Sequence, residues 1–145
     1  MGIDVNVRAA KPRDIPELIR LYNGVNEIND YPGVIFNHSY FRHFIGSREK
    51  IILVAESGSS VIGALSAEFL SYAKYTYLNH AVISKKNMNN GIGNLLFREI
   101  ESKTKKRGYN IIVSEAYDWN KKIQEFLEHR GYAESGKTIL YIKKL

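Results

Sequence analysis

The stretch that decides the fold is NMNNGIGNLLFREIE, residues 87–101. An asparagine-rich approach leads into Gly91-Ile92-Gly93, and apolar residues at helical spacing follow at Ile92, Leu95, Leu96 and Ile100. A helix start carries unpaired backbone N–H groups and partial positive charge, and glycines let a ligand approach the backbone. The stretch is therefore typical of an anion-binding turn between a strand and a helix, although a glycine turn that only links the two elements fits the same letters.

The elements around this turn follow from hydrophobic periodicity and turn residues. Three β-rich segments at 50–56, 61–70 and 75–83 have short connections, which predicts an antiparallel meander. Before them, we expect a strand at 5–9, a helix that begins at Asp14, and a short helix at 39–47. Asp14 would cap its helix, with Glu17 three residues later. After them, we expect a helix from 92 to about 107, a strand at 110–116, a helix at 120–130 closed by Gly131, and strands at 132–134 and 138–142. The order predicts an α/β protein of the α+β type. We expect a mixed, mostly antiparallel sheet of six to seven strands flanked by about four helices.

Length and composition narrow the class of protein. The 145 residues fit one domain over 1–145, and the longest apolar run, 51–55, is far too short to span a membrane. The N-terminus has no apolar signal core, so no membrane partner is expected. The absence of cysteine excludes disulfides, thiolate metal sites and a cysteine nucleophile, and it favours a cytoplasmic protein.

The charge balance favours an anionic partner. Twenty-one Lys and Arg residues face 15 Asp and Glu residues, a formal net charge of +6. Nucleic acid, a phosphorylated cofactor and a membrane surface are all compatible with this balance. The basic clusters at 103–107 and 143–144 lack interleaved aromatic residues, so nucleic-acid binding is the least favoured alternative.

Two phosphate-binding motifs can be compared with the glycine turn. A P-loop needs Gly-Lys-Ser/Thr at the helix start, but Asn94-Leu95 follows Gly93, which excludes that motif. A dinucleotide fingerprint needs a small residue where Leu96 stands, although Glu115 does fall where a ribose-binding acid belongs. A dinucleotide-binding protein therefore stays open as an alternative, despite the antiparallel meander that precedes the glycines.

From about residue 5 to 145, the chain resembles the GNAT superfamily of N-acyltransferases in element order and length. The family's acyl-coenzyme A motif, Q/R-x-x-G-x-G/A, appears as Met88-Asn89-Asn90-Gly91-Ile92-Gly93. A second family motif, an Asn leading a helix that ends in Gly-Phe or Gly-Tyr, runs from Asn120 to Gly131-Tyr132. The resemblance implies a sheet splayed between its fourth and fifth strands. It also implies a metal-free N-acetyltransferase that uses acetyl-coenzyme A (acetyl-CoA) on a small-molecule or peptide primary amine by direct attack.

The resemblance also implies the cofactor contacts. The backbone around Asn89 to Asn94 would cradle the pyrophosphate, residues 82–84 would pair with the pantetheine arm, and Asn120 would lie beside the thiol. The expected cofactor-binding residues are Val82, Ile83, Ser84, Met88, Asn89, Asn90, Gly91, Ile92, Gly93, Asn94 and Asn120. Met88 departs from the family's Gln or Arg, so one phosphate contact is absent. Lys85 and Lys86 either compensate for it or are simply solvated.

Three residues are candidates for catalysis. His80 on the fourth strand is the preferred base, because imidazole titrates near neutral pH. Glu68 is an alternative base and Tyr117 a substitute acid, although all three also fit purely structural roles. Leu127 stands where the family often has a catalytic tyrosine, and it cannot donate a proton. This departure keeps open a non-catalytic acyl-CoA binding or sensor domain.

The resemblance implies that the loop at 23–31 lines the acceptor side. Glu27, Asp30 and Tyr31 provide two acids and an aromatic ring, which favour a cationic amine. Dimers are common in the family, so a homodimer is compatible with the resemblance, although the sequence shows no interface signature.

Overall fold

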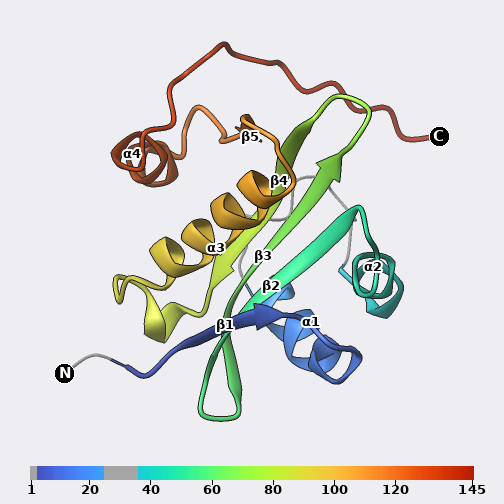
Figure 1. The fold of residues 1–145 in the computed structure, drawn as a ribbon, viewed down its shortest axis with the longest axis vertical. Helices are drawn as coiled ribbons and strands as arrows, with labels where there is room; N and C mark the ends of the chain where they lie inside the picture. Colours follow the sequence, from blue (N-terminus) through green and yellow to red (C-terminus); the bar gives the residue numbers. More distant parts are fainter. Residues whose placement is uncertain (1–2, 25–35) are drawn as a thin grey trace. The chain divides into compact units, whose positions relative to one another are not determined.

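The computed structural model describes residues 3–24 and 36–145, and the chain divides into two compact units, Met1–Ser114 and Glu115–Leu145. Each unit is described by itself, and a single domain over 1–145 remains a proposal. In chain order the elements are β1 (Asn6–Ala9), the 3-10 helix η1 (Pro12–Asp14), α1 (Ile15–Asn23), α2 (His38–Phe44), β2 (Lys50–Ser57), β3 (Ser60–Leu70), β4 (Tyr75–Ile83), the 3-10 helix η3 (Lys85–Asn87), α3 (Ile92–Lys106), β5 (Ile112–Ser114) and α4 (Lys121–His129) (Figure 1).

The sheet of the first unit is mixed, as predicted. Its five strands lie in the order β1-β2-β3-β4-β5; the first four are antiparallel, and β5 joins β4 in parallel after the α3 crossover. The parallel register covers only Thr76 to Leu78 of β4, opposite Ile112 to Ser114. The remainder of β4 therefore extends beyond its β5 partner, which agrees with the expected separation of the fourth and fifth strands.

The strand count is lower than predicted. Within the described residues the sheet has five strands, and the segments 132–134 and 138–142 contain none. In the second segment, Ile139 and Tyr141 are 78% and 86% exposed. Strand propensity mainly reflects packing against neighbouring strands, so β-branched and aromatic residues alone do not make a strand.

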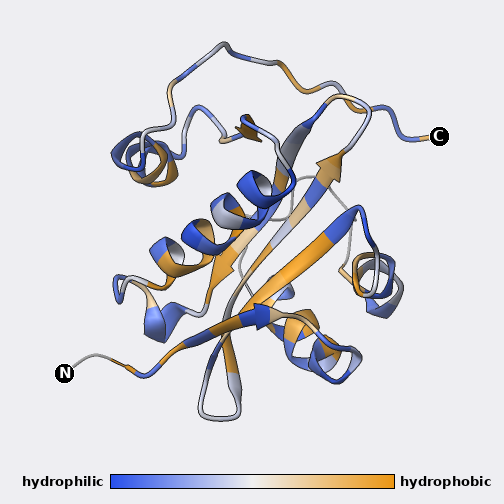
Figure 2. Ribbon diagram, viewed as in Figure 1, coloured by the Kyte–Doolittle hydropathy of each residue, from blue (hydrophilic) through white to orange (hydrophobic). Residues whose placement is uncertain are grey.

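The two faces of the sheet carry different helices. α3 packs on one face, where the hydroxyls of Thr76 on β4 and Thr104 on α3 lie 2.8 Å apart and are buried. α1 and α2 cover the other face, over a core formed by Ile15, Leu18, Tyr22, Phe36, Phe41, Phe44, Ile52, Val54, Ala64 and Val82. Figure 2 shows apolar residues gathered along β2 and β3 and on the sides of the helices turned toward the sheet. Burial of each such large side chain contributes about 1.5–3 kcal/mol.

Asp14 begins α1 in a different way from the predicted capping box. Its carboxylate accepts hydrogen bonds from Arg8 Nη1 (2.7 Å), Arg8 Nη2 (3.0 Å) and the Lys11 N–H (2.7 Å). The Glu17 carboxylate, predicted to face the start of α1, instead accepts from the Val61 N–H at 2.9 Å. Asp14 therefore ties the start of α1 to β1 just before it, and Glu17 ties α1 to β3, 44 residues away. Arg8 also donates to Glu56 on β2 at 2.8 Å.

Candidate active site

The turn before α3 has the geometry that its glycine predicts. Gly91 is the N-cap residue with φ +78°, and Asn89 two residues earlier has φ +65°. The first helical hydrogen bond joins the Leu95 N–H to the Gly91 carbonyl at 3.2 Å. The N–H groups of Ile92 and Gly93 precede that bond, so the helix itself provides no acceptor for them. The turn thus presents backbone donors at the positive end of the α3 dipole.

Gly63 on β3 allows this turn to sit close to the sheet. A Cβ atom added at Gly63 would lie 3.0 Å from Ile92 Cγ2 and 3.4 Å from the Val82 carbonyl oxygen. Ile92 is buried, so it anchors the first turn of α3 against β3. Sequence reasoning missed Gly63. Its only signal was a glycine inside a strand, which often marks a close backbone approach.

The second half of β4 offers backbone groups on the side that faces away from β3. The Ser84 N–H bonds back to the Ile62 carbonyl on β3 at 2.9 Å. Because successive N–H groups alternate along a strand, the N–H groups of Ile83 and Ala81 turn to the opposite edge. In the described chain, the β5 ladder on that edge ends at Leu78. This edge is suited to pair with an extended ligand.

The side chains of the predicted cofactor residues divide into two groups. Val82 is buried in the core under α1 and α2, and the Ser84 hydroxyl accepts from Asn87 Nδ2 at 2.6 Å, so both hold the local structure. Met88, Asn89, Asn90 and Asn94 are exposed. From Val82 to Arg98 the chain carries three cationic side chains and no acid, which favours an anion at this turn.

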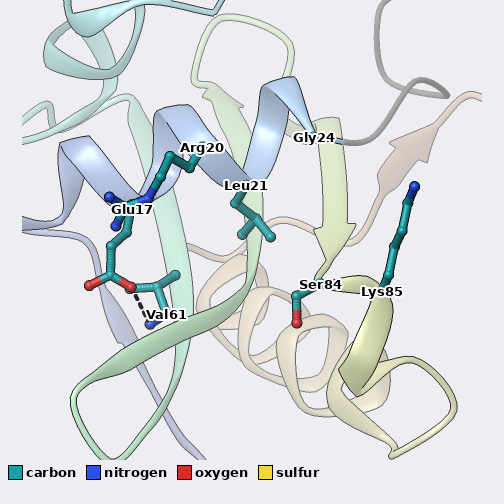
Figure 3. Close-up of a pocket in the computed structure, with 7 residues that line it drawn as sticks. All are labelled: Glu17, Arg20, Leu21, Gly24, Val61, Ser84 and Lys85. Atoms are coloured by element: carbon teal, nitrogen blue, oxygen red, sulfur yellow. Dashed lines mark hydrogen bonds between the residues drawn. The ribbon is translucent and has the colours of Figure 1, made fainter.

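A cleft of about 270 Å³ lies beside the end of β4 (Figure 3). Ser84 and Lys85 line one side of it, and residues of α1 line the other. The full lining is Glu17, Arg20, Leu21, Gly24, Val61, Ser84 and Lys85. The cleft therefore adjoins the strand end predicted to meet the pantetheine arm.

A β-bulge in β4 directs two polar side chains to one face. Ser66 pairs with His80 while the next residue, Ala67, pairs with Leu78, so Asn79 is an extra residue in β4. A bulge lets neighbouring side chains point to the same side of a sheet. His80 contacts aromatic rings from α1 and α2, and Asn79 contacts Glu68 on the same face of the sheet.

His80 is half-buried among aromatic rings of α1, of α2 and of Phe36 just before α2. Its Nδ1 lies 3.3 Å from the Tyr40 hydroxyl, and its ring centroid lies 5.2 Å from Phe36 and 6.2 Å from Tyr22 in edge-on geometry. Burial raises the pKa of the Tyr22 hydroxyl well above its usual value, so this group stays neutral. The preferred base is therefore held in a defined orientation by neighbours that sequence reasoning did not identify.

Glu68, the alternative base, lies on the same face as His80 and is already engaged. One carboxylate oxygen accepts from Asn79 Nδ2 at 3.0 Å, and the other lies 3.3 Å from Lys50 Nζ. Lys50 Nζ in turn lies 2.6 Å from His43 Nε2. A proton accepted from a substrate would remove the negative charge that Glu68 sets against Lys50. The geometry therefore favours a structural role for Glu68.

The second unit contains Tyr117 and Asn120. The Asn120 side chain caps α4 by accepting from the Ile123 N–H at 3.3 Å. The Tyr117 ring stacks on Trp119 at 5.5 Å between centroids with an interplanar angle of 11°. The Tyr132 N–H bonds to the carbonyl of Leu127 at 3.0 Å, and Gly131 has φ +89°. The second motif therefore forms a helix that Asn120 caps at its start and Gly131 ends, as the sequence predicts.

The remaining predictions concern the acceptor loop, metal ions and membranes. Glu27, Asp30 and Tyr31 lie outside the described residues. Within residues 3–24 and 36–145, no three His, Asp or Glu side chains gather in a way that would hold a metal ion. Over those same ranges, no helix has both the length and the apolar character needed to cross a membrane.

Residues 20–132 match the model of the acetyltransferase (GNAT) family. The chain belongs to the GNAT acetyltransferase family. The match includes β4, the glycine turn, α3 and both sequence motifs. No curated protein sequence matches the chain at a significant level.

Solved structures share the GNAT fold at low sequence identity. AAC(6′)-Iy, bound to the bisubstrate analogue CoA-S-monomethyl-acetylneamine, has a TM-score of 0.81 and 13% identity over 98% of this chain and 99% of its own. An aminoglycoside acetyltransferase from an uncultured soil metagenomic sample, in complex with sisomicin, has a TM-score of 0.79 and 16% identity over 97% and 96%. A transcriptional regulator from Bacillus halodurans has a TM-score of 0.79 and 18% identity over 97% and 100%. At these identities the likeness establishes the fold.

Proposed function

We propose that this GNAT protein is an N-acetyltransferase that moves the acetyl group of acetyl-CoA to a primary amine. The observation that carries the proposal is the joint presence of a glycine turn at the start of α3 and a β4 edge beyond Leu78 that β5 does not pair with. The first feature suits a pyrophosphate and the second suits an extended pantetheine arm. Membership of the GNAT family supports both assignments.

The residues of this chain fit acetyl-CoA. The backbone N–H groups of Ile92 and Gly93 would receive the pyrophosphate, with the exposed residues Asn89 and Asn90 beside it. The strand segment 82–84 would hold the pantetheine arm through its backbone, since the Val82 and Ser84 side chains are already engaged. Asn120, at the start of α4, would meet the thiol end of the cofactor. Lys85 and Lys86 supply the positive charge that Met88 does not.

Bound acetyl-CoA would supply a thioester, whose C–S bond is replaced by a C–N bond to the amine while the thiolate leaves with the bonding electron pair. His80 takes the proton that the acceptor ammonium must lose before its lone pair can attack. The Ile83 N–H donates to the carbonyl oxygen as negative charge develops there. Because a thiol has a reference pKa of about 8.5, the thiolate can leave near neutral pH without the tyrosine that Leu127 replaces.

The acceptor is proposed to be a cationic amine, either a small molecule or a peptide. This part of the proposal rests on Glu27, Asp30 and Tyr31, whose two negative charges and aromatic ring would attract a cationic amine. Two fold neighbours are described with aminoglycoside-type ligands, which supports the same chemical class. A screen of polyamines, aminoglycosides, amino acids and peptides should favour cationic acceptors, whereas a strong preference for an acidic acceptor would contradict it. A cytoplasmic location, a single domain and a homodimer belong to the same proposal.

Calorimetric titration with acetyl-CoA tests the cofactor site, and separate titrations with NAD and ATP are the controls. We expect the protein to bind acetyl-CoA with micromolar affinity but not NAD or ATP. Gly93→Glu should lose this binding, because the new carboxylate would repel the pyrophosphate. Gly136→Glu is the matched control, since a side chain at that exposed glycine enters open space. A preference for NAD would support the dinucleotide alternative. Acetyl-CoA binding without thioester consumption on any amine would support a sensor domain.

A further inference from the structure

The contact between Tyr40 on α2 and His80 on β4 has a chemical consequence. The Tyr40 hydroxyl lies 3.3 Å from Nδ1 of His80, so Nδ1 is the ring nitrogen that this tyrosine engages. A neutral imidazole has one nitrogen that donates and one that accepts. Because a tyrosine hydroxyl can do either, the direction of the hydrogen bond at Nδ1 decides which nitrogen is which. Tyr40 is therefore placed to decide whether Nε2 is basic.

Tyr40 is itself held firmly. Its backbone N–H donates to the Asn37 side chain at 3.0 Å, which caps α2. Its ring meets Phe36, Phe41 and Phe44 with centroids 4.9, 5.1 and 5.1 Å away. A group fixed in this way can orient a neighbour without losing much conformational freedom of its own.

We infer that Tyr40 is a positioning residue for His80, whose Nδ1–H donates to the Tyr40 hydroxyl oxygen and leaves Nε2 as the basic nitrogen. An oxygen acceptor at Nδ1 serves both the neutral ring and the imidazolium, because Nδ1 carries a hydrogen in both states. The hydrogen bond then need not reverse when Nε2 gains a proton from the acceptor amine. The opposite direction would place the hydrogen of the neutral ring on Nε2 and block that role.

The inference rests on the proposed function for the direction of the hydrogen bond and for its effect on turnover, but the tautomer is measured without substrate. Long-range ¹H–¹⁵N correlation spectra of the ¹⁵N-labelled protein report which ring nitrogen carries the proton. They are recorded at about pH 8, above the reference imidazole pKa of about 6.5. The signals of His80 are assigned by their loss in His80→Gln. We expect the proton on Nδ1 in the native protein and a shift toward Nε2 in Tyr40→Phe.

Tyr72→Phe is the control, because it removes the same oxygen from a tyrosine that is 85% exposed. Unchanged signals of His38 and His43, on the same helix as Tyr40, show that α2 stays folded in Tyr40→Phe. We expect this variant to lose about five- to tenfold in kcat, the effect of one hydrogen bond, with KM for acetyl-CoA unchanged. Tyr72→Phe should match the native protein.

The possible outcomes separate the inference from the proposed function. A proton on Nε2 in the native protein would overturn the inference, even if Tyr40→Phe fails to fold. The same tautomer in the native protein and in a folded Tyr40→Phe would also overturn it, whether or not the protein is an acetyltransferase. A tautomer change without any thioester consumption would leave Tyr40 as the residue that positions His80 and would count against the proposed function.

Discussion

The hydroxyl of Tyr40 lies 3.3 Å from Nδ1 of His80, although 40 residues separate them along the chain. The contact depends on the bulge at Asn79, because regular alternation through Leu78, Asn79 and His80 would put the His80 side chain on the same face as Thr76 and Leu78, where α3 packs. It also depends on α2, which carries Tyr40 over this face of the sheet. The bulge in β4 and the placement of α2 are thus both needed to bring Tyr40 to the proposed base.

Replacing His80 with alanine tests its role as base. We expect His80→Ala to lower turnover at least tenfold, because general base catalysis typically contributes about 10²–10⁴-fold. The affinity for acetyl-CoA should not change, since the side chain faces α1 and α2 rather than the glycine turn. Steady-state kinetics and calorimetric titration measure the two effects. His38→Ala, at an exposed position of α2, is the control, and unchanged kinetics in His80→Ala would remove His80 from the mechanism.

Glu68→Gln separates the two candidate bases. Glutamine keeps the size of the side chain but loses the negative charge opposite Lys50. Because both oxygens of Glu68 are already engaged, we expect turnover within about threefold of the native value and stability within about 1 kcal/mol. Kinetics and urea unfolding check this together. A loss of turnover larger than that of His80→Ala in a folded protein would transfer the role of base to Glu68.

Gly63→Ala tests the packing of the glycine turn on β3. The added methyl group would lie 3.0 Å from Ile92 Cγ2, so the Ile92 side chain or the start of α3 must give way by a few tenths of an ångström. We expect a loss of at least about 1 kcal/mol in the free energy of unfolding, typical of overpacking. The affinity for acetyl-CoA should weaken with it, because Ile92 belongs to the turn. Gly136→Ala, where the methyl group meets open space, is the matched control; native stability and affinity in Gly63→Ala would show that the turn does not depend on this contact.

The pair between Arg8 and Asp14 predicts a dependence of stability on pH. The guanidinium of Arg8 lowers the pKa of the Asp14 carboxyl, and the hydrogen bond from the Lys11 N–H acts in the same direction. A carboxyl whose pKa is lower in the folded state stabilises the fold above its unfolded pKa, which is about 3.9. This stabilisation is lost as the pH falls through the lower, folded value.

Asp14→Asn measures this contribution. At neutral pH we expect the variant to be less stable by about 2 kcal/mol, the range for hydrogen bonds to a charged group. The difference from the native protein should shrink as the pH is lowered below about 4. Urea unfolding of both proteins across the acidic range provides the measurement, with Asp4→Asn in the exposed N-terminal segment as the control. A difference that stays constant with pH would mean that the charge of Asp14 is not what stabilises the start of α1.

Some parts of the site could be predicted because they depend on neighbours in the sequence. The glycine turn, the start of α3 and the cap of α4 at Asn120 all follow from residues within one helical turn of each other. The capping box at Asp14 and Glu17 was wrong for the opposite reason. Arg8 on β1 and the Val61 N–H on β3, which both lie outside the first turn of α1, take the two carboxylates instead.

The sequence by itself determined the order of elements, the antiparallel meander, the helix-opening glycine turn and its surroundings free of acids. These features arise from local backbone preferences, hydrophobic periodicity and charge, which neighbouring residues largely specify. Only the tertiary structure decided that His80 meets Tyr40, that Glu68 is held by Lys50 and Asn79, and that Gly63 receives Ile92. It also decided that 138–142 forms no strand. The register of a bulge and the pairing of a strand depend on which partner lies opposite, and that information resides in contacts between distant parts of the chain.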